Sequence, residues 1–207
     1  MKGTTHIAIG VAAAAVLGDI NHVSMSYLLP SAIIGSLIPD IDTGSSIINK
    51  FLIRDPKFRD DKKILYFGAL SLFSFLIFCQ FYIKPFLYIG LVAAILALSS
   101  HRGIFHTVFI PLMALYFGSK TNYFLQYEMM AVGIGLHLVA DMFNKSGIML
   151  FFPFTRKEFR MPITFYSRSF TMSIIELVIV MCSFIGVLLK FDYSRNLMLG
   201  LLRTVNF

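Results

Sequence analysis

The chain has 207 residues, of which 57% are hydrophobic and only 14% charged, and its mean hydropathy is +0.76. A soluble domain of this length could not bury so much apolar surface in one core. The composition therefore excludes an ordinary soluble protein and predicts an integral membrane protein. No linker or low-complexity tract interrupts the apolar stretches, so we expect a single membrane-embedded domain over residues 1–207.

Two short stretches rich in alanine and glycine come first, at Thr5–Gly18 and Tyr27–Ile38. At ~1.5 Å per residue, each would cover only about two thirds of a ~30 Å hydrocarbon core. Small residues favour close packing of helices inside a protein over exposure to lipid. We therefore predict a short N-terminal helical hairpin that is buried or re-entrant.

Five longer apolar runs follow, and most of them approach the ~20 residues that a spanning helix needs. They lie at Ile64–Ile83, Pro85–Ser100, Ile104–Ser119, Tyr127–Phe143 and Ser173–Lys190. The predicted fold class is all-α, an integral membrane bundle of about seven helices in which five are spans.

Basic residues are distributed unevenly about these helices. If the N-terminus is cytoplasmic and the helices alternate across the membrane, most of the 18 lysine and arginine residues lie on the cytoplasmic side. The positive-inside rule then favours a multi-pass protein of the cell membrane with a cytoplasmic N-terminus and an external C-terminus.

The same arrangement brings seven ionisable side chains to the cytoplasmic helix ends. Ionisable groups at membrane depth are costly, so several of them at one depth indicate a functional site. These residues are His6, Asp40, Asp42, His101, His106, His137 and Asp141.

In GLHLVAD, His137 and Asp141 are four residues apart, which places both on one face of a helix. They could grip one metal ion or simply hydrogen-bond to each other. In PDIDTGSS, Pro39 ends the preceding helix and Asp40 and Asp42 follow on irregular backbone. These carboxylates could ligate a cation or belong to an ordinary helix-end turn.

The segment HRGIFHT places His101 before a short turn and His106 inside the following helix. A spacing of five is off a single helix face, so the two imidazoles could share a site only if His101 lies on the turn. Arg102 could hold a phosphate through its bidentate guanidinium group, or it could serve only as a topology marker.

The ordered blocks THIAIG, GSLIPDID, SSHRGIFHT and GLHLVADMF, the last followed by GIMLFFPF, resemble the membrane-bound metal-dependent hydrolases, the YdjM-like inner-membrane proteins. That family is distantly similar to zinc-dependent phospholipase C and the P1-type nucleases, which are all-helical with a polynuclear zinc site. The resemblance implies that the seven ionisable residues are metal ligands. Thr43 stands where a further histidine is expected, so one ligand is missing or replaced by water.

Mixed histidine and carboxylate ligands suit Zn²⁺ or Mn²⁺, and seven exceed the three or so protein ligands of one catalytic ion. Two ions are therefore plausible. Such a site would activate water for attack on a phosphoester, and the candidate catalytic residues are Asp40, Asp42 and Arg102. The alternatives are a metal or proton transporter and a noncatalytic membrane scaffold with a structural metal.

Aromatic and basic residues alternate through Lys145–Met172. Aromatic rings favour the membrane interface and cations attract anionic lipid, so this segment could form a rim that admits a lipid head group. It could also be an ordinary juxtamembrane loop. The expected partners are membrane lipids with anionic head groups. The net charge of +7 requires no nucleic-acid partner, because its excess lies next to the membrane.

Overall fold

The computed structural model of the chain describes residues 1–20, 23–42, 63–98, 103–166 and 169–205. This part of the chain holds seven α-helices, two short 3-10 helices and no β-strand, so the predicted all-α class and helix number are confirmed. The elements are α1 (Gly3–Ile20), α2 (Met25–Leu37), η1 (Ile38–Asp42), α5 (Lys63–Phe81), α6 (Lys84–Leu98), η2 (Ile104–His106), α7 (Phe109–Gly118), α8 (Phe124–Met142) and α9 (Phe170–Val205).

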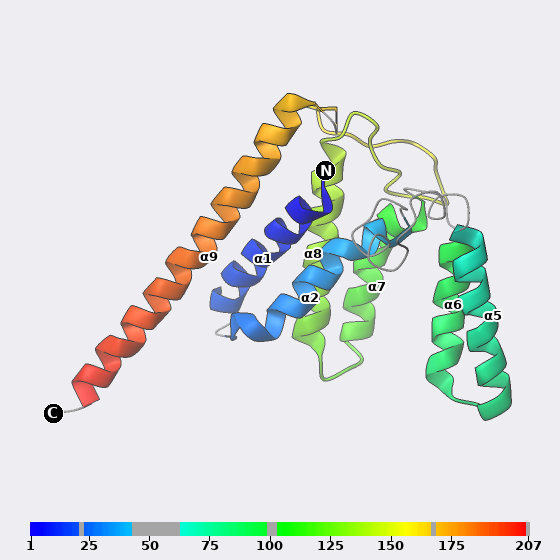
Figure 1. Cartoon of the computed structure of the whole chain (residues 1–207), viewed down its shortest axis with the longest axis horizontal. Helices are drawn as coiled ribbons and strands as arrows, with labels where there is room; N and C mark the ends of the chain where they lie inside the picture. The colour runs from blue at the N-terminus through cyan, green and yellow to red at the C-terminus, as the bar shows by residue number, and fades with distance from the viewer. Residues whose placement is uncertain (21–22, 43–62, 99–102, 167–168, 206–207) are drawn as a thin grey trace.

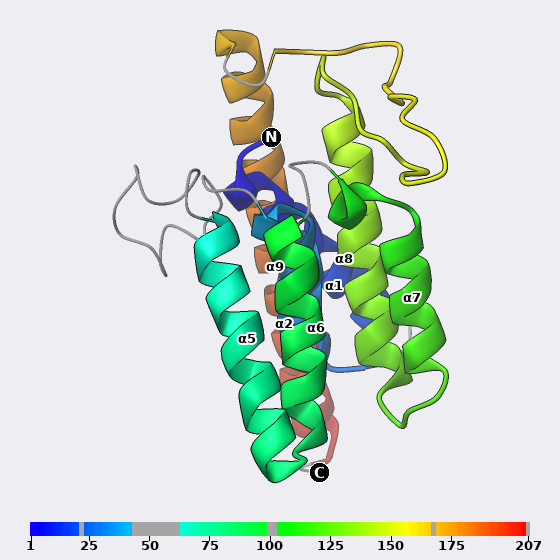
Figure 2. The ribbon, with the colours of Figure 1, turned by 90° about the vertical axis from the view of Figure 1, so that its right-hand side faces the viewer.

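The helices form a main group and a separate hairpin (Figure 1). In the main group, α2 packs against α8 and α1, α1 also packs against α8 and α9, and α7 packs against α8. The hairpin of α5 and α6 packs chiefly on itself and reaches the main group at η1 (Figure 2). Helix α8 therefore lies at the centre, where it can carry site residues toward several neighbours.

Small residues hold α1, α2 and α8 close together, as predicted for the N-terminal hairpin. Ala14 and Ala32 are fully buried in a cluster with Leu28 and Met129. The outer face of the hairpin is open, because Ile34 is exposed. The hairpin is therefore packed into the protein on one side only.

Helix α7 begins later than predicted. The run Ile104–Ser119 was expected to be one helix, with His106 inside it, but α7 starts only at Phe109 and His106 belongs to η2. Thr107 has extended backbone angles (φ −108°, ψ 155°), which separate the two elements. Pro111 lacks an amide hydrogen and fits only the first turn of a helix, so it also favours this late start.

Helix α9 ends later than predicted. The apolar run stops at Lys190, yet the backbone stays helical to Val205. Within it, Phe170–Leu189 is the one stretch of the described chain that is long and apolar enough to cross a membrane. Shorter apolar helices occur at Gly3–Gly18, Met25–Ile41, Tyr66–Phe81, Phe86–Ile95 and Phe109–Gly118. The five predicted spans and their alternation across the membrane stay a prediction.

One end of the main group, here called the polar end, brings together segments that are distant in the sequence (Figures 1 and 2). The first turns of α1, the last turn of α8 and the segment 144–166 lie toward this end, opposite the turn between α7 and α8. The short elements η1 and η2 contact each other. The elements that carry His6, Asp40, His106, His137 and Asp141 therefore meet at one set of helix ends, as predicted, whereas His101 and the side chain of Asp42 lie outside the described residues.

Candidate metal centre

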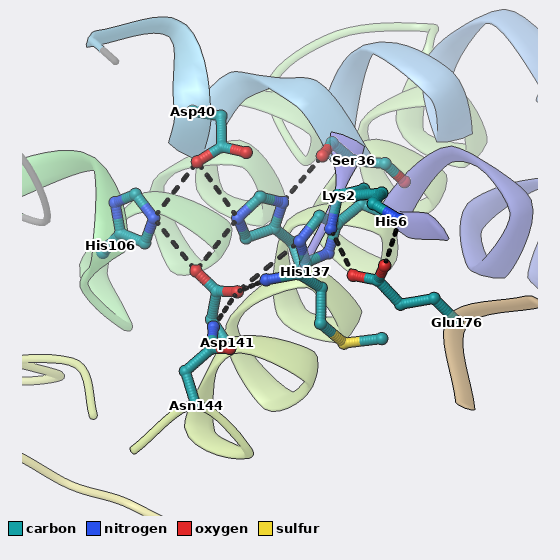
Figure 3. Close-up of polar contacts among 10 residues, drawn as sticks. Lys2, His6, Ser36, Asp40, His106, His137, Asp141, Asn144 and Glu176 are labelled. Carbon is teal, nitrogen blue, oxygen red and sulfur yellow. Dashed lines mark hydrogen bonds and ion pairs between the residues drawn. The ribbon is translucent and has the colours of Figure 1, made fainter. Parts of the chain in front are cut away.

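Helix α8 supplies two side chains of the site, one turn apart. His137 and Asp141 are both buried. The Nδ1 atom of His137 lies 2.8 Å from the backbone oxygen of Ser36 on α2 (Figure 3). Because a carbonyl can only accept a hydrogen bond, Nδ1 is the protonated nitrogen and the lone pair of neutral His137 is on Nε2.

Glycines make this hydrogen bond possible by letting α2 and α8 touch. A Cβ atom on Gly133 would lie 2.7 Å from the backbone oxygen of Ala32 and 3.0 Å from the amide nitrogen of Ser36. A Cβ atom on Gly35 would lie 2.2 Å from the backbone oxygen of Met130. Any larger residue at these two positions would push the helices apart and withdraw Ser36 from His137.

The two short 3-10 helices supply the other two side chains. In η1, Asp40 follows Pro39 at the end of α2. In η2, the amide of His106 donates to the Gly103 oxygen, and the Thr107 hydroxyl donates to the Ile104 oxygen. These tight local turns aim both side chains at the end of α8 (Figure 3).

Four side chains converge on one point. The Nε2 atom of His106 lies 3.7 Å from Oδ1 of Asp40 and 3.5 Å from Oδ2 of Asp141. The Nε2 atom of His137 lies 3.8 Å and 3.7 Å from the same two oxygens. One donor atom from each of the four residues lies within 4.8 Å of all the others.

These separations fit a bound cation better than direct hydrogen bonds. Hydrogen bonds between nitrogen and oxygen span about 2.7–3.2 Å, which is shorter than the four separations here. Accordingly, Nε2 of His137 has no hydrogen-bond partner in the described structure. Four ligands at about 2.0–2.2 Å around a tetrahedral ion lie about 3.4 Å apart. Two imidazole nitrogens and two carboxylate oxygens suit Zn²⁺ or Mn²⁺.

Asp40 differs from the other three members of the cluster in its exposure to solvent. The side chains of His106, His137 and Asp141 are at most 5% exposed, whereas that of Asp40 is 20% exposed. The cluster is therefore closed on the side of α8 and reaches solvent at η1. A substrate or a water molecule would approach past Asp40.

His6 lies behind Asp141 instead of among the four converging side chains. Its Nε2 atom is 3.5 Å from Oδ1 of Asp141, and its ring stacks on His137 with centroids 3.7 Å apart. The same oxygen accepts a hydrogen bond from Nδ2 of Asn144 at 2.8 Å and lies 3.2 Å from the amino group of Met1. These contacts fix the carboxylate so that Oδ2 faces the site.

A family comparison adds an independent observation to this geometry. The family model described as YdjM inner membrane protein matches residues 1–202. The chain belongs to this family. The resemblance seen in the sequence blocks is therefore confirmed over nearly the whole chain. No curated protein and no solved structure matched the chain, and hydrolase activity and the distant similarity to phospholipase C and P1 nuclease stay predictions.

Several predicted site residues of this YdjM family member lie outside the described structure. His101 and Arg102 fall between the described ranges, as does Thr43. The backbone of Asp42 closes η1, but its side chain is not described. Their roles as ligands or catalytic groups, and the second metal ion, therefore stay predictions.

Sequence reasoning missed an ion pair between a buried carboxylate and an exposed lysine that supports the centre. Glu176 of α9 is buried; its Oε1 accepts the amide hydrogen of Lys2 at 2.7 Å, and its Oε2 lies 3.2 Å from Nζ of Lys2 (Figure 3). This contact ties α9 to the start of α1, which carries His6. The signal was a single acidic residue within an apolar run, but nothing in the sequence pairs it with a residue 174 positions away.

Proposed function

We propose that this YdjM family member is a metal-dependent hydrolase of the inner membrane that cleaves a phosphoester of a lipid or lipid-linked substrate. The observation that carries the proposal is the convergence of Asp40, His106, His137 and Asp141 on one point. When bound there, Zn²⁺ or Mn²⁺ supplies a Lewis acid and lowers the pKa of water.

The protein's own residues account for the other requirements of hydrolysis. Asp40 is the partly exposed member of the cluster and turns Oδ1 toward His106 and His137, so its second oxygen is placed to orient an incoming water and accept its proton. Asp141 lies on the closed side, where Asn144 and the amino group of Met1 hold it as a fixed ligand. We extend the role of Asp40 to Asp42 and assign Arg102 to the substrate phosphate.

Lipid as the substrate is supported by the segment 144–166 at the same end of the fold (Figure 1). Phe154, Ile163 and Tyr166 are exposed there beside exposed Arg156 and Lys157. Apolar rings can enter the membrane interface while the cations attract anionic head groups. A soluble substrate would not require such a surface.

A structural metal site is the second function that the geometry supports. Four protein ligands complete a tetrahedral site, and structural zinc sites are closed in this way, whereas catalytic sites keep a position for water. The exposure of Asp40 favours a catalytic site, because this ligand borders solvent and can be displaced or shared.

The test is a screen of lipid phosphoesters against the purified protein with Zn²⁺ or Mn²⁺ added after chelation. We expect metal-dependent release of a phosphate or a phosphorylated head group from at least one anionic lipid. If no ester is cleaved but Zn²⁺ crosses the membrane of sealed vesicles that contain the protein, a transporter replaces the hydrolase. If neither occurs and metal only raises the unfolding temperature, the centre is structural.

The proposal also places the centre on the cytoplasmic side, and this can be tested by labelling. In a chain with Cys79→Ser and Cys182→Ser, we expect an impermeant maleimide to label Lys120→Cys, in the turn between α7 and α8, in intact cells. Lys157→Cys, in the segment 144–166 at the opposite end of the fold, should be labelled only after permeabilisation. The reverse pattern would invert the orientation, and labelling of both from outside would show that α8 does not cross the membrane.

A further inference from the structure

An apolar cavity of about 290 Å³ lies beside the candidate metal centre. Helix α1 packs against both α8 and α9, and the cavity lies between the latter two helices near the polar end of the fold. Its walls are almost entirely hydrocarbon and include Ile9, Leu136, Ala140, Phe165, Ile175 and Ile179. Ala140 precedes Asp141, so the cavity and the metal centre share a stretch of α8.

We propose that this cavity binds a hydrocarbon chain of a membrane lipid whose head group lies at the polar end of the fold, beside the segment 144–166. The inference goes beyond the proposed function, because it names a lipid-binding site that the cluster itself does not contact. The position of the cavity against an apolar helix indicates that its occupant is a lipid chain. One wall is α9, which contains the stretch Phe170–Leu189. This stretch is long and apolar enough to cross a membrane, and most of it is exposed at the surface of the protein.

The cavity also has a route to the lipid. Val139 contributes to its wall and is 45% exposed, so the cavity opens at the surface of α8. On α9, the outward neighbours Ile174 and Val178 are also exposed. An acyl chain can therefore move from the bilayer into the cavity without crossing a polar surface.

The apolar walls of the cavity and the polar groups near one of its ends match the two parts of a phospholipid. The walls offer no polar group to bind a sugar, a nucleotide or a free phosphate, which excludes these as occupants of the cavity itself. Ala140 and Phe143 of its wall flank Asp141 in the sequence at the end of α8, and Phe165 of its wall belongs to the segment 144–166. An amphiphile with an anionic head and an apolar tail fits both parts at once.

The experiment uses the full-length protein in vesicles of phosphatidylethanolamine and phosphatidylglycerol. A small fraction of the phosphatidylglycerol carries a diazirine in the middle of one acyl chain, and cross-linked peptides are identified by mass spectrometry. We expect the label in peptides from α8 and α9 that contain Leu136 or Ile175. Label spread evenly over the exposed faces of α5, α6 and α9 would overturn the proposal.

Filling the cavity provides the matched comparison. Ile175→Trp places an indole in the cavity, whereas Ile174→Trp places the same group on the exposed side of the same helix. We expect Ile175→Trp to reduce cross-linking in the cavity about tenfold and Ile174→Trp to leave it unchanged. Should Ile175→Trp fail to fold, Val139→Trp at the exposed mouth serves the same purpose. Cross-linking that survives both cavity variants would overturn the proposal.

These outcomes separate the cavity from the hydrolase. Metal content should be unchanged in both tryptophan variants, because neither residue belongs to the four converging side chains. Hydrolysis of a lipid by the wild type without labelling of the cavity would overturn the lipid-chain site alone. Labelling of the cavity without hydrolysis would support the lipid-chain site and count against the proposed reaction.

Discussion

Replacing Asp40 with asparagine is expected to reduce hydrolysis of a lipid phosphoester at least about 100-fold, the usual loss when a general base is removed. The substitution keeps the volume of the side chain but removes its negative charge. Because Asp40 is the most exposed member of the cluster, it is the residue that an incoming water or phosphate meets first. Its loss should therefore affect turnover more than folding.

The measurement is the initial rate of Asp40→Asn on any lipid phosphoester that the wild type cleaves, at saturating metal. The control is Glu158→Gln, which removes a carboxylate from the exposed segment 144–166 and leaves the cluster intact. Glu158→Gln should retain the wild-type rate. A wild-type rate in Asp40→Asn would exclude this carboxylate from the reaction.

Gly133→Ala should have the second large effect, although position 133 carries no functional group. A Cβ atom there would meet the backbone of α2 at 2.7 Å, and backbone cannot give way as a flexible side chain can. Helices α2 and α8 must separate, which withdraws the Ser36 oxygen from Nδ1 of His137. Overpacking of this kind costs about 1–3 kcal/mol, and we expect metal affinity to fall about tenfold or more.

Gly135→Ala is the matched control on the same helix, because a Cβ atom at Gly135 would meet nothing within 4 Å. Thermal unfolding in detergent and titration with Zn²⁺ would be measured for both variants. We expect Gly135→Ala to match or slightly exceed the stability of the wild type, since alanine favours helix over glycine. Equal metal affinity in the two variants would show that the approach of α2 to α8 does not position His137.

Much of this fold could be predicted, because long apolar runs favour helices over most of their length. The four-residue spacing of His137 and Asp141 is likewise sufficient to place both side chains on one face of a helix. The convergence of Asp40, His106 and His6 near that face followed from the alternation of helix ends. Local periodicity and connectivity were sufficient for these features.

Other features depend on contacts that sequence periodicity does not encode. His106 lies on η2 instead of in α7, because the extended backbone of Thr107 breaks the helix despite the apolar run. His6 faces the far oxygen of Asp141, and only the packing of α1 against α8 decides which oxygen it meets. The pairing of Glu176 with Lys2 is a tertiary contact of the same kind.

The most direct test of the account is metal analysis of the purified wild type beside His137→Ala and Asp141→Ala, with X-ray absorption to identify the ligands. We expect the wild type to bind at least one Zn²⁺ or Mn²⁺ ion per chain, with imidazole and carboxylate ligands. Both variants should lose that metal while remaining helical and monodisperse, because helix packing supplies most of the stability of the fold. Equal metal content in all three proteins, or no metal in the wild type after incubation with either ion, would contradict the proposed centre.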